Sequence, residues 1–271
     1  MAFVADDEGR AMSSQNKLFS IRGLSVDVPG RRLIDDLTLD LPKGQVIALI
    51  GHNGSSKSTL LKVLARQMTP AGGQVEFGGR DISAWQPRDY ARALAFLPQT
   101  TPPAEGMTVR ELVSLGRYPW HGALGRFGAD DHRAVDAALV ECGVDPFADR
   151  LVDTLSGGER QRVWLAMMVA QQAGTLLLDE PISALDIAHQ VEVLSLVQRM
   201  SHHQSRSAIV VLHDVNMAAR FCDHIVALKG GRLAMQGTPG DLMRPEVLAA
   251  IYGLPMQVLA DAAGRPAAMP A

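Results

Sequence analysis

The chain has few cysteines, no excess of basic residues and no long apolar run, and each shortage narrows what the protein can be. Its 271 residues include only two cysteines, Cys142 and Cys222. These are too few for a disulfide framework and lack partners at metal-ligand spacing, which favours a reducing compartment. The formal net charge of -3 lacks the basic balance that is typical of nucleic-acid-binding proteins, so we expect no nucleic-acid partner.

The chain also lacks the ~18 consecutive apolar residues that a membrane-spanning helix needs. Its richest apolar segment is only VWLAMMVA, at 163–170. The N-terminus carries Asp6, Asp7 and Glu8 and no apolar run of signal-peptide length, so we expect no export by that route and a cytosolic protein. Any attachment to a membrane would then come through another subunit.

What the chain does have is apolar content of 47%, enough to bury a sizeable core in one large or two modest domains. Residues 1–16 and 261–271 are small, polar or rich in proline and alanine, which predicts flexible tails. We therefore expect the folded domain to span residues 17–260.

The pattern of apolar residues predicts an α/β fold. The short, continuously apolar segments VIALI (46–50), TLLLD (175–179) and AIVVLH (208–213) are typical of strands in a mostly parallel sheet with flanking helices. Segments 18–28 and 33–41 alternate around a turn at Pro29-Gly30, which predicts an antiparallel N-terminal β region. Residues from about 103 to 160 show helical patterns and no buried strand, which indicates an inserted helical subdomain.

A glycine-rich loop follows VIALI directly and precedes the helical segment STLLKVLAR. This strand-loop-helix arrangement is suited to binding phosphate, because loop N–H groups and a helix N-terminus face the anion. It predicts that the α/β core is that of a P-loop NTPase. We expect Lys57 to reach the β- and γ-phosphates of ATP and the Ser58 hydroxyl to coordinate Mg²⁺. The predicted ATP-binding residues are Gly51, His52, Asn53, Gly54, Ser55, Ser56, Lys57, Ser58 and Thr59.

Ser56 departs from the phosphate-loop pattern GxxxxGK[ST], which has glycine before the lysine. Glycine allows the backbone to approach phosphate without a Cβ in the way. Two hypotheses follow: the serine is a tolerated variant, or it weakens or slows the use of nucleotide.

Adjacent carboxylates follow the strand-like segment TLLL. We expect Asp179 to bind the metal ion and Glu180 to act as general base toward the attacking water. Gln99 ends another strand-like run and would offer its amide to the metal or the water, and His213 would contact the γ-phosphate. The alternatives are a solvated turn for the two acids, an exposed loop glutamine for Gln99 and a structural role for the histidine.

A second glycine-rich helix start, LSGGERQ, lies at 155–161. Ser156 and Glu159 have the spacing of a capping box, while Gly157 and Gly158 leave backbone amides bare for an anion. The chain thus has two phosphate cradles but one carboxylate pair. This imbalance indicates a site shared between two chains.

The motifs in this order resemble the nucleotide-binding subunit of ATP-binding cassette (ABC) transporters. The matching segments are Walker A (51–59), the Q-loop glutamine (99), the signature (155–161), Walker B (176–180), the D-loop SALD (183–186) and the switch histidine (213). The resemblance implies a homodimer with ATP between the Walker motifs of one subunit and the partner's signature, and membrane permease subunits driven by its closure and by hydrolysis. The signature residues that would bind ATP in trans are Ser156, Gly157, Gly158 and Glu159.

Within that family, residues 102–128 and 212–223 are similar to the ATPases of bacterial iron-siderophore, haem and vitamin B12 importers, most of all those for ferric hydroxamates. This implies a peripheral subunit on the cytoplasmic face of the inner membrane, with a substrate-binding protein as an indirect partner. Tyr118, Trp120 and Phe127 would then contact the permease, or else pack the helical subdomain.

Two further positions differ from the usual family pattern. An aromatic residue that would stack on adenine is missing near Val28, and Ile182 replaces a threonine. Rival hypotheses are a soluble ABC protein acting as a clamp in DNA repair or translation, and a regulatory subunit that binds ATP without turnover. The single cassette without coiled coils speaks against the first, and Glu180 with His213 against the second.

Overall fold

The computed structural model describes residues 3–4, 16–122 and 125–271. Its contacts divide the chain into two compact units, which are described separately. The first unit comprises residues 1–84 and 201–271, and the second comprises residues 85–200.

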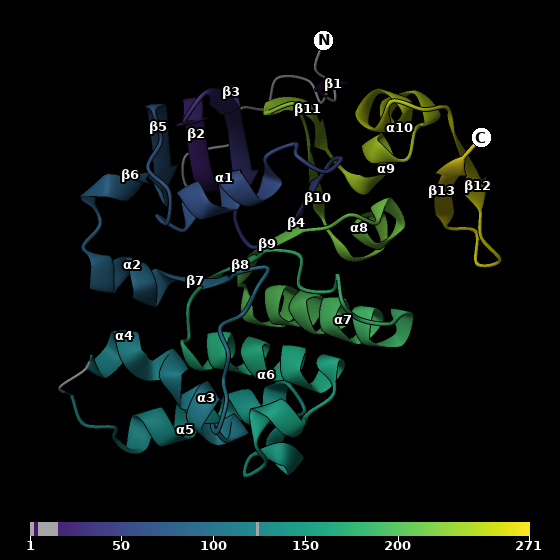
Figure 1. Ribbon diagram of the computed structural model, residues 1–271. Helices are drawn as coiled ribbons and strands as arrows, with labels where there is room; N and C mark the ends of the chain where they lie inside the picture. The colour runs from purple at the N-terminus through teal and green to yellow at the C-terminus, as the bar shows by residue number, and fades with distance from the viewer. Residues whose placement is uncertain (1–2, 5–15, 123–124) are drawn as a thin grey trace. The chain divides into compact units, whose positions relative to one another are not determined.

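The first unit contains a mixed sheet with the strand order β1-β11-β10-β4-β9 (Figure 1). β4 pairs in parallel with both β9 and β10, and β10 pairs antiparallel with β11. Every residue of β4 and β9 is buried, as their continuously apolar sequences predict for central parallel strands. The strands are β1 (Phe3–Val4), β4 (Val46–Ile50), β9 (Ser207–Val211), β10 (His224–Lys229) and β11 (Arg232–Gly237).

A separate antiparallel sheet in the same unit has the order β3-β2-β5-β6. Its strands are β2 (Lys17–Val28), β3 (Arg31–Pro42), β5 (Gly72–Phe77) and β6 (Arg80–Asp81). The predicted hairpin is confirmed, because β2 and β3 pair on either side of the turn and Gly30 adopts a φ of 75° there. Glycine reaches this left-handed region without a steric penalty.

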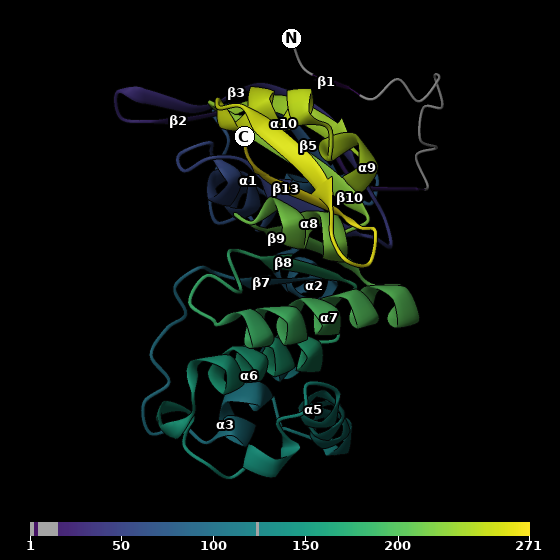
Figure 2. The same ribbon diagram turned by 90° about the vertical axis from the view of Figure 1, so that its right-hand side faces the viewer.

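The remaining elements of the first unit are helices and a C-terminal hairpin, whose strands β12 and β13 pair antiparallel. The elements are α1 (Lys57–Leu64), α8 (Val215–Phe221), α9 (Pro239–Leu242), α10 (Pro245–Tyr252), β12 (Met256–Ala260) and β13 (Pro266–Pro270). β13 runs beside α8 (Figure 2), where Asn216 donates to the carbonyl of Ala268 at 3.1 Å and accepts from its N–H at 2.7 Å.

This hairpin corrects the expectation of a loose C-terminal tail over residues 261–271. The small residues of β13 show no alternation of apolar and polar residues, so the sequence did not predict a strand. Backbone pairing with β12 and the side-chain amide of Asn216 supply the hydrogen bonds that the strand needs. Of the tail expected over residues 1–16, residues 1–2 and 5–15 lie outside the described part of the chain. Phe3 and Val4 pair with β11.

The second unit contains two parallel strands, β7 (Leu94–Leu97) and β8 (Thr175–Leu178). Its helices are α2 (Pro87–Ala93), α3 (Val109–Ser114), α4 (Tyr118–His121), α5 (Ala129–Glu141), α6 (Gly157–Ala170) and most of α7 (Ile187–Gln204). α6 packs against α3 and α5 (Figure 2). Helices and no strand occur within 103–122 and 125–160, where the helical subdomain is expected, although the compact unit is larger because it includes β7 and β8.

Within residues 3–4, 16–122 and 125–271, none of the helices is both long and apolar enough to cross a bilayer.

Candidate ATP-binding and hydrolysis site

The loop at 51–56 joins the buried strand β4 to α1, as predicted. The side chain of Lys57 is almost fully enclosed, at 5% exposure, and its Nζ donates to the carbonyls of Gly51 (2.9 Å) and His52 (3.1 Å). Gly51 has a φ of 138°, and a Cβ there would lie 2.2 Å from the carbonyl oxygen of Leu228. The loop therefore requires glycine at this position, and it curls around the ammonium group.

Ser56 precedes α1 in the left-handed conformation, with a φ of 76°. This is the conformation for which glycine is favoured, and it explains why the pattern has glycine at this position. The Ser56 hydroxyl donates to the carbonyl of Leu33 in β3 at 2.6 Å. Its side chain is therefore directed toward β3 rather than toward Lys57, which favours the hypothesis of a tolerated variant.

His213 lies at the same edge of the sheet as this loop. β4 and β9 pair in parallel with Leu49 opposite Val211, so Gly51 and His213 each follow a matched residue by two positions. β9 ends at Val211, two residues earlier than the predicted segment, and His213 is an exposed residue between β9 and α8. Asp214 then caps α8 by accepting from the N–H groups of Asn216 (2.7 Å) and Met217 (3.1 Å).

In the second unit, the parallel pairing of β7 and β8 brings Gln99 and Glu180 together. Leu97 of β7 lies opposite Leu178 of β8, and each polar residue follows its strand residue by two positions. Nε2 of Gln99 donates to Oε2 of Glu180 at 2.8 Å. β7 ends at Leu97 because Pro98 has no N–H to continue a ladder.

Asp179 and Glu180 have different surroundings, as expected for neighbours at the end of a strand. Asp179 is 2% exposed, and its N–H donates to the carbonyl of Leu97 at 2.9 Å. Glu180 adopts a φ of 52°, which is uncommon for a residue with a side chain. The resulting turn is closed by Ser183, whose N–H donates to the Glu180 carbonyl at 3.3 Å.

These carboxylates open onto a cavity of about 220 Å³ within the second unit. The lining includes Gln99, Asp179, Glu180, Gly157 and Gln161. The structure therefore places the predicted general base, a predicted metal ligand and the start of the LSGGERQ helix around one space.

α6 begins at Gly157, and the predicted capping box is present. The Ser156 hydroxyl accepts from the N–H of Glu159 at 3.3 Å, while the Glu159 carboxylate accepts from the Ser156 N–H and hydroxyl at 2.8 Å each. These hydrogen bonds hold the pKa of Glu159 below its usual value. A carboxylate engaged in this way serves its own helix, so the contact with ATP expected of Glu159 stays a prediction.

The two signature glycines differ in what surrounds them. A Cβ at Gly157 would meet only Cδ2 of Leu185, at 3.9 Å, whereas a Cβ at Gly158 would come within 2.2 Å of Cδ2 of His189. Packing within the described chain thus requires glycine at 158 but not at 157. Gly157 lines the cavity, where an anion could accept from the N–H groups at the start of α6.

The sequence interpretation missed His189. Its N–H and its Nδ1 both approach Oδ1 of Asp186, at 2.9 and 2.8 Å, so the ring is fixed at the start of α7 with its edge on Gly158. The hydrogen bond from the His189 N–H, followed by the one from the His189 imidazole, holds the pKa of Asp186 below its usual value. The only sequence signal was an aspartate three residues before a histidine at a helix start, which is too common to indicate a site.

The predicted metal ligands are a hydroxyl, an amide oxygen and a carboxylate, from Ser58, Gln99 and Asp179. Across the described residues there is no cluster of three or more His, Cys, Asp or Glu side chains suited to a metal ion. The Gln99 nitrogen donates to Glu180, so its oxygen is the atom left to act as a ligand. Hydroxyl, amide and carboxylate oxygens are hard donors, the kind that Mg²⁺ prefers.

The predicted site residues thus form two groups, one in each unit. The first unit contains the phosphate loop with Lys57 and His213, and the second contains Gln99, the two carboxylates and the signature residues. The phosphate loop and His213 follow the paired strands β4 and β9, while Gln99 and the two carboxylates follow the paired strands β7 and β8. Active sites of α/β sheets lie at the carboxyl ends of such strands.

A model of the family described as "ABC transporter" matches residues 34–183, which contain the phosphate loop, the carboxylates and the signature helix. The chain belongs to the ABC transporter family. It is an ABC ATPase, and the matched range contains the segments that resemble Walker A (51–59) and Walker B (176–180).

Among curated relatives, the ABC protein is 41% identical to the iron(3+)-hydroxamate import ATP-binding protein FhuC of Bacillus subtilis (strain 168), over 89% of this chain and 90% of that one. It is 40% identical to the ferric enterobactin transport ATP-binding protein FepC of Escherichia coli (strain K12), over 87% and 88%. Among solved structures, an inward-facing ABC transporter described as metal-chelate type aligns with a TM-score of 0.82 and 27% identity, over 94% of this chain and 98% of that one.

Proposed function

We propose that two copies of this ABC ATPase hydrolyse ATP to drive import of a ferric siderophore, of the hydroxamate type, through a separate membrane permease. The observation that carries the proposal is the hydrogen bond between Gln99 and Glu180 at a cavity that Gly157 also lines. The predicted general base and the start of the signature helix thus border one space. The names of the relatives support a ferric siderophore as the cargo, and the hydroxamate type rests on the name of FhuC.

In this proposal the chain's own residues bind phosphate and activate water. Lys57 turns its ammonium group from the loop carbonyls to the β- and γ-phosphates, and His213 donates to the γ-phosphate from the same sheet edge. Glu180 accepts a proton from the attacking water, while the Gln99 side chain orients it. Mg²⁺, held by Ser58, Asp179 and the Gln99 oxygen, would neutralise charge on the phosphates.

The signature helix acts on the ATP bound to the partner copy. Ser156 and the bare amide of Gly157 lie at the N-terminus of α6, where the helix dipole attracts an anion. The room around Gly157 supports this role, because the chain's own packing does not account for glycine there. We expect a homodimer with two ATP molecules.

The partners are integral membrane permease subunits, and the location is the cytoplasmic face of a bacterial inner membrane. Of the aromatic residues considered for permease docking, Tyr118 is 57% exposed and suits that role. Phe127 packs between the rings of His121 and His132, at centroid distances of 5.8 and 4.8 Å. This favours internal packing for Phe127.

The test is reconstitution with a permease and a substrate-binding protein from the same organism. Uptake of ⁵⁵Fe bound to a hydroxamate siderophore should require ATP and should stop with Glu180→Gln, while ferric catecholate, haem and vitamin B12 serve as competing cargoes. ATP-driven uptake of one of these instead would refute the hydroxamate assignment alone. A lack of ATP hydrolysis in the complete complex would refute the transport role and favour a regulatory subunit.

A further inference from the structure

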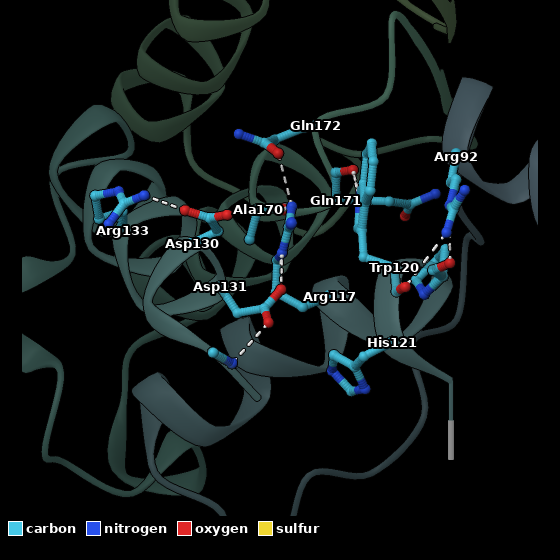
Figure 3. Close-up of polar contacts among 12 residues, drawn as sticks. Arg92, Arg117, Trp120, His121, Asp130, Asp131, Arg133, Ala170, Gln171 and Gln172 are labelled. Carbon is cyan, nitrogen blue, oxygen red and sulfur yellow. Dashed lines mark hydrogen bonds and ion pairs between the residues drawn. The ribbon is translucent and has the colours of Figure 1, made fainter. Parts of the chain in front are cut away.

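The indole of Trp120 is held between two guanidinium groups that come from different parts of the second unit (Figure 3). Cζ of Arg92 and Cζ of Arg117 each lie 4.9 Å from the ring centroid, on opposite sides of the ring. Such stacking is attractive because the ring faces carry negative charge density. Trp120 is 37% exposed, so part of its side chain remains at the surface while the ring is stacked between the two guanidinium groups.

Trp120 also contacts the end of the signature helix. Its Nε1–H donates to the carbonyl of Gln171 at 2.8 Å, and Gln171 is the residue that caps the C-terminus of α6. The Gln171 amide in turn donates to the carbonyls of Ala91 and, at 3.0 Å, of Leu94. The C-terminal end of α6 is therefore bound to the junction between α2 and β7.

Arg92 lies just before that junction. Its guanidinium donates to the carbonyls of Pro119 (3.0 Å) and Trp120 (3.3 Å), so α2 binds the C-terminal end of α4 through the same residue that stacks on the indole. β7 begins two residues later, at Leu94, and leads to Gln99. Arg92 thus stands at the start of the segment that ends at the catalytic amide.

Arg117 stacks on the other face of the indole, and its guanidinium group is held by three hydrogen-bond partners. It is 4% exposed and donates to Oδ1 of Asp131, to the Ala170 carbonyl and to Oε1 of Gln172, each at 2.8 Å. A buried guanidinium with these partners has little freedom to move. The indole is consequently fixed against α5 and the end of α6.

We propose that Trp120 is a positioning residue for ATP hydrolysis, which clamps the start of the β7–Gln99 segment to the C-terminal end of the signature helix. The opposite ends of these two elements carry Gln99 and Gly157, which both line the cavity beside Glu180. α6 also packs against β7, so holding one pair of ends together restricts both the angle between the two elements and the separation of their other ends. The inference rests on the proposed hydrolytic function.

The test compares Trp120→Ala, Trp120→Phe and Arg92→Lys with the native protein in the complex with its permease. Arg133→Ala is the matched control, because Arg133 forms an exposed ion pair with Asp130 on the same subdomain (Figure 3). We expect kcat to fall on the order of tenfold for Trp120→Ala and Arg92→Lys, with KM for ATP changed less than twofold, because ATP binding depends on the Walker A loop. Trp120→Phe, which keeps the stack but loses the Nε1–H, should be intermediate, and Arg133→Ala should match the native protein.

Hydrogen–deuterium exchange gives a readout that does not depend on turnover. Trp120→Ala should speed exchange at residues 98–101 and 157–161 and leave residues 51–58 unchanged. A native kcat for Trp120→Ala, or a fall in kcat that follows a general loss of thermal stability and ATP affinity, would overturn the proposal. A native complex that does not hydrolyse ATP would refute the proposed function. The exchange pattern of Trp120→Ala would still show whether Trp120 holds the two segments together.

Discussion

Gln99 donates its amide hydrogen to the carboxylate of Glu180 across two parallel strands, with 2.8 Å between Nε2 and Oε2. The contact follows from register, because each residue stands two positions beyond a matched pair of strand residues. It engages Oε2 of Glu180. The amide therefore orients the carboxylate while leaving it able to accept a proton.

Glu180→Gln should lower the ATP turnover of the assembled complex by about 10²- to 10⁴-fold, the usual contribution of a general base. ATP affinity should be retained, because the substituted amide keeps the size of the side chain and can still accept from Gln99. Phosphate release and equilibrium ATP binding measure the two effects. Turnover within threefold of native would show that another group activates the water.

Ser56→Gly and Ser56→Ala should differ in stability. Glycine relieves a left-handed conformation that costs a side chain about 1–2 kcal/mol, which offsets the loss of a hydrogen bond worth about 0.5–1.5 kcal/mol. Alanine loses the bond to Leu33 and keeps the strain, so it should be about 1 kcal/mol less stable than native in urea unfolding.

The same variants decide between the two hypotheses for the Walker A loop. Since the Ser56 side chain is directed toward β3, ATP affinity and turnover of Ser56→Gly should stay within about twofold of native. An increase of tenfold or more in either would mean that serine cripples the loop.

Gly157→Ala and Gly158→Ala should separate a binding role from a packing role. Alanine at 158 collides with His189, and overpacking of this kind costs about 1–3 kcal/mol. Addition of His189→Ala should restore most of that stability. Gly157→Ala should unfold like the native protein but hydrolyse ATP more slowly, because its methyl group meets the partner's nucleotide. Equal stability of the two single variants would contradict the contact seen at Gly158.

Acid should destabilise the second unit through Asp131. The N–H of Gly128, followed by the guanidinium of Arg117, holds the pKa of this carboxyl below its usual value of 3.8. A lowered pKa means that the charged form stabilises the fold above that value, and that the stabilisation is lost as pH falls further and Asp131 takes up its proton. Melting temperature between pH 6 and pH 2.5 measures the effect.

Asp131→Asn should reduce the fall in melting temperature at acid pH. At pH 7 it should lower the free energy of unfolding by about 3 kcal/mol, because Arg117 stays buried without its counterion. Asp130→Asn is the control, since its ion pair with Arg133 is exposed and contributes less than about 1 kcal/mol. Similar losses in both variants would show that burial of the Arg117 pair has no special effect.

The sequence predicted the elements whose physics is local. Continuous apolar runs identified β4, β8 and β9, the alternating pattern identified the β2–β3 hairpin, and the spacing of Ser156 and Glu159 identified the cap of α6. The phosphate loop was found for the same reason, because its strand, glycines and helix are contiguous. Ends of strands were less accurate, since Pro98 and the turn at His213 interrupt pairing before the apolar pattern stops.

Features that join distant segments could not be predicted. The approach of His189 to Gly158 depends on how α7 meets α6, and the bonds from Asn216 to Ala268 connect residues 52 positions apart. No periodicity reports such contacts. The Trp120 stack was missed for a related reason, since an aromatic residue beside prolines and glycines is equally compatible with an interface and with packing on two distant arginines.

The left-handed backbone at Ser56 has a consequence for how nucleotide-binding proteins are identified. The sequence motif specifies glycine at this position, but what the loop requires is a positive φ angle. Ser56 adopts that angle while its hydroxyl donates to a carbonyl of the neighbouring strand. Proteins with this substitution escape a strict text search. At such a position the hydrogen-bond acceptor near the loop is as informative as the letter in the motif.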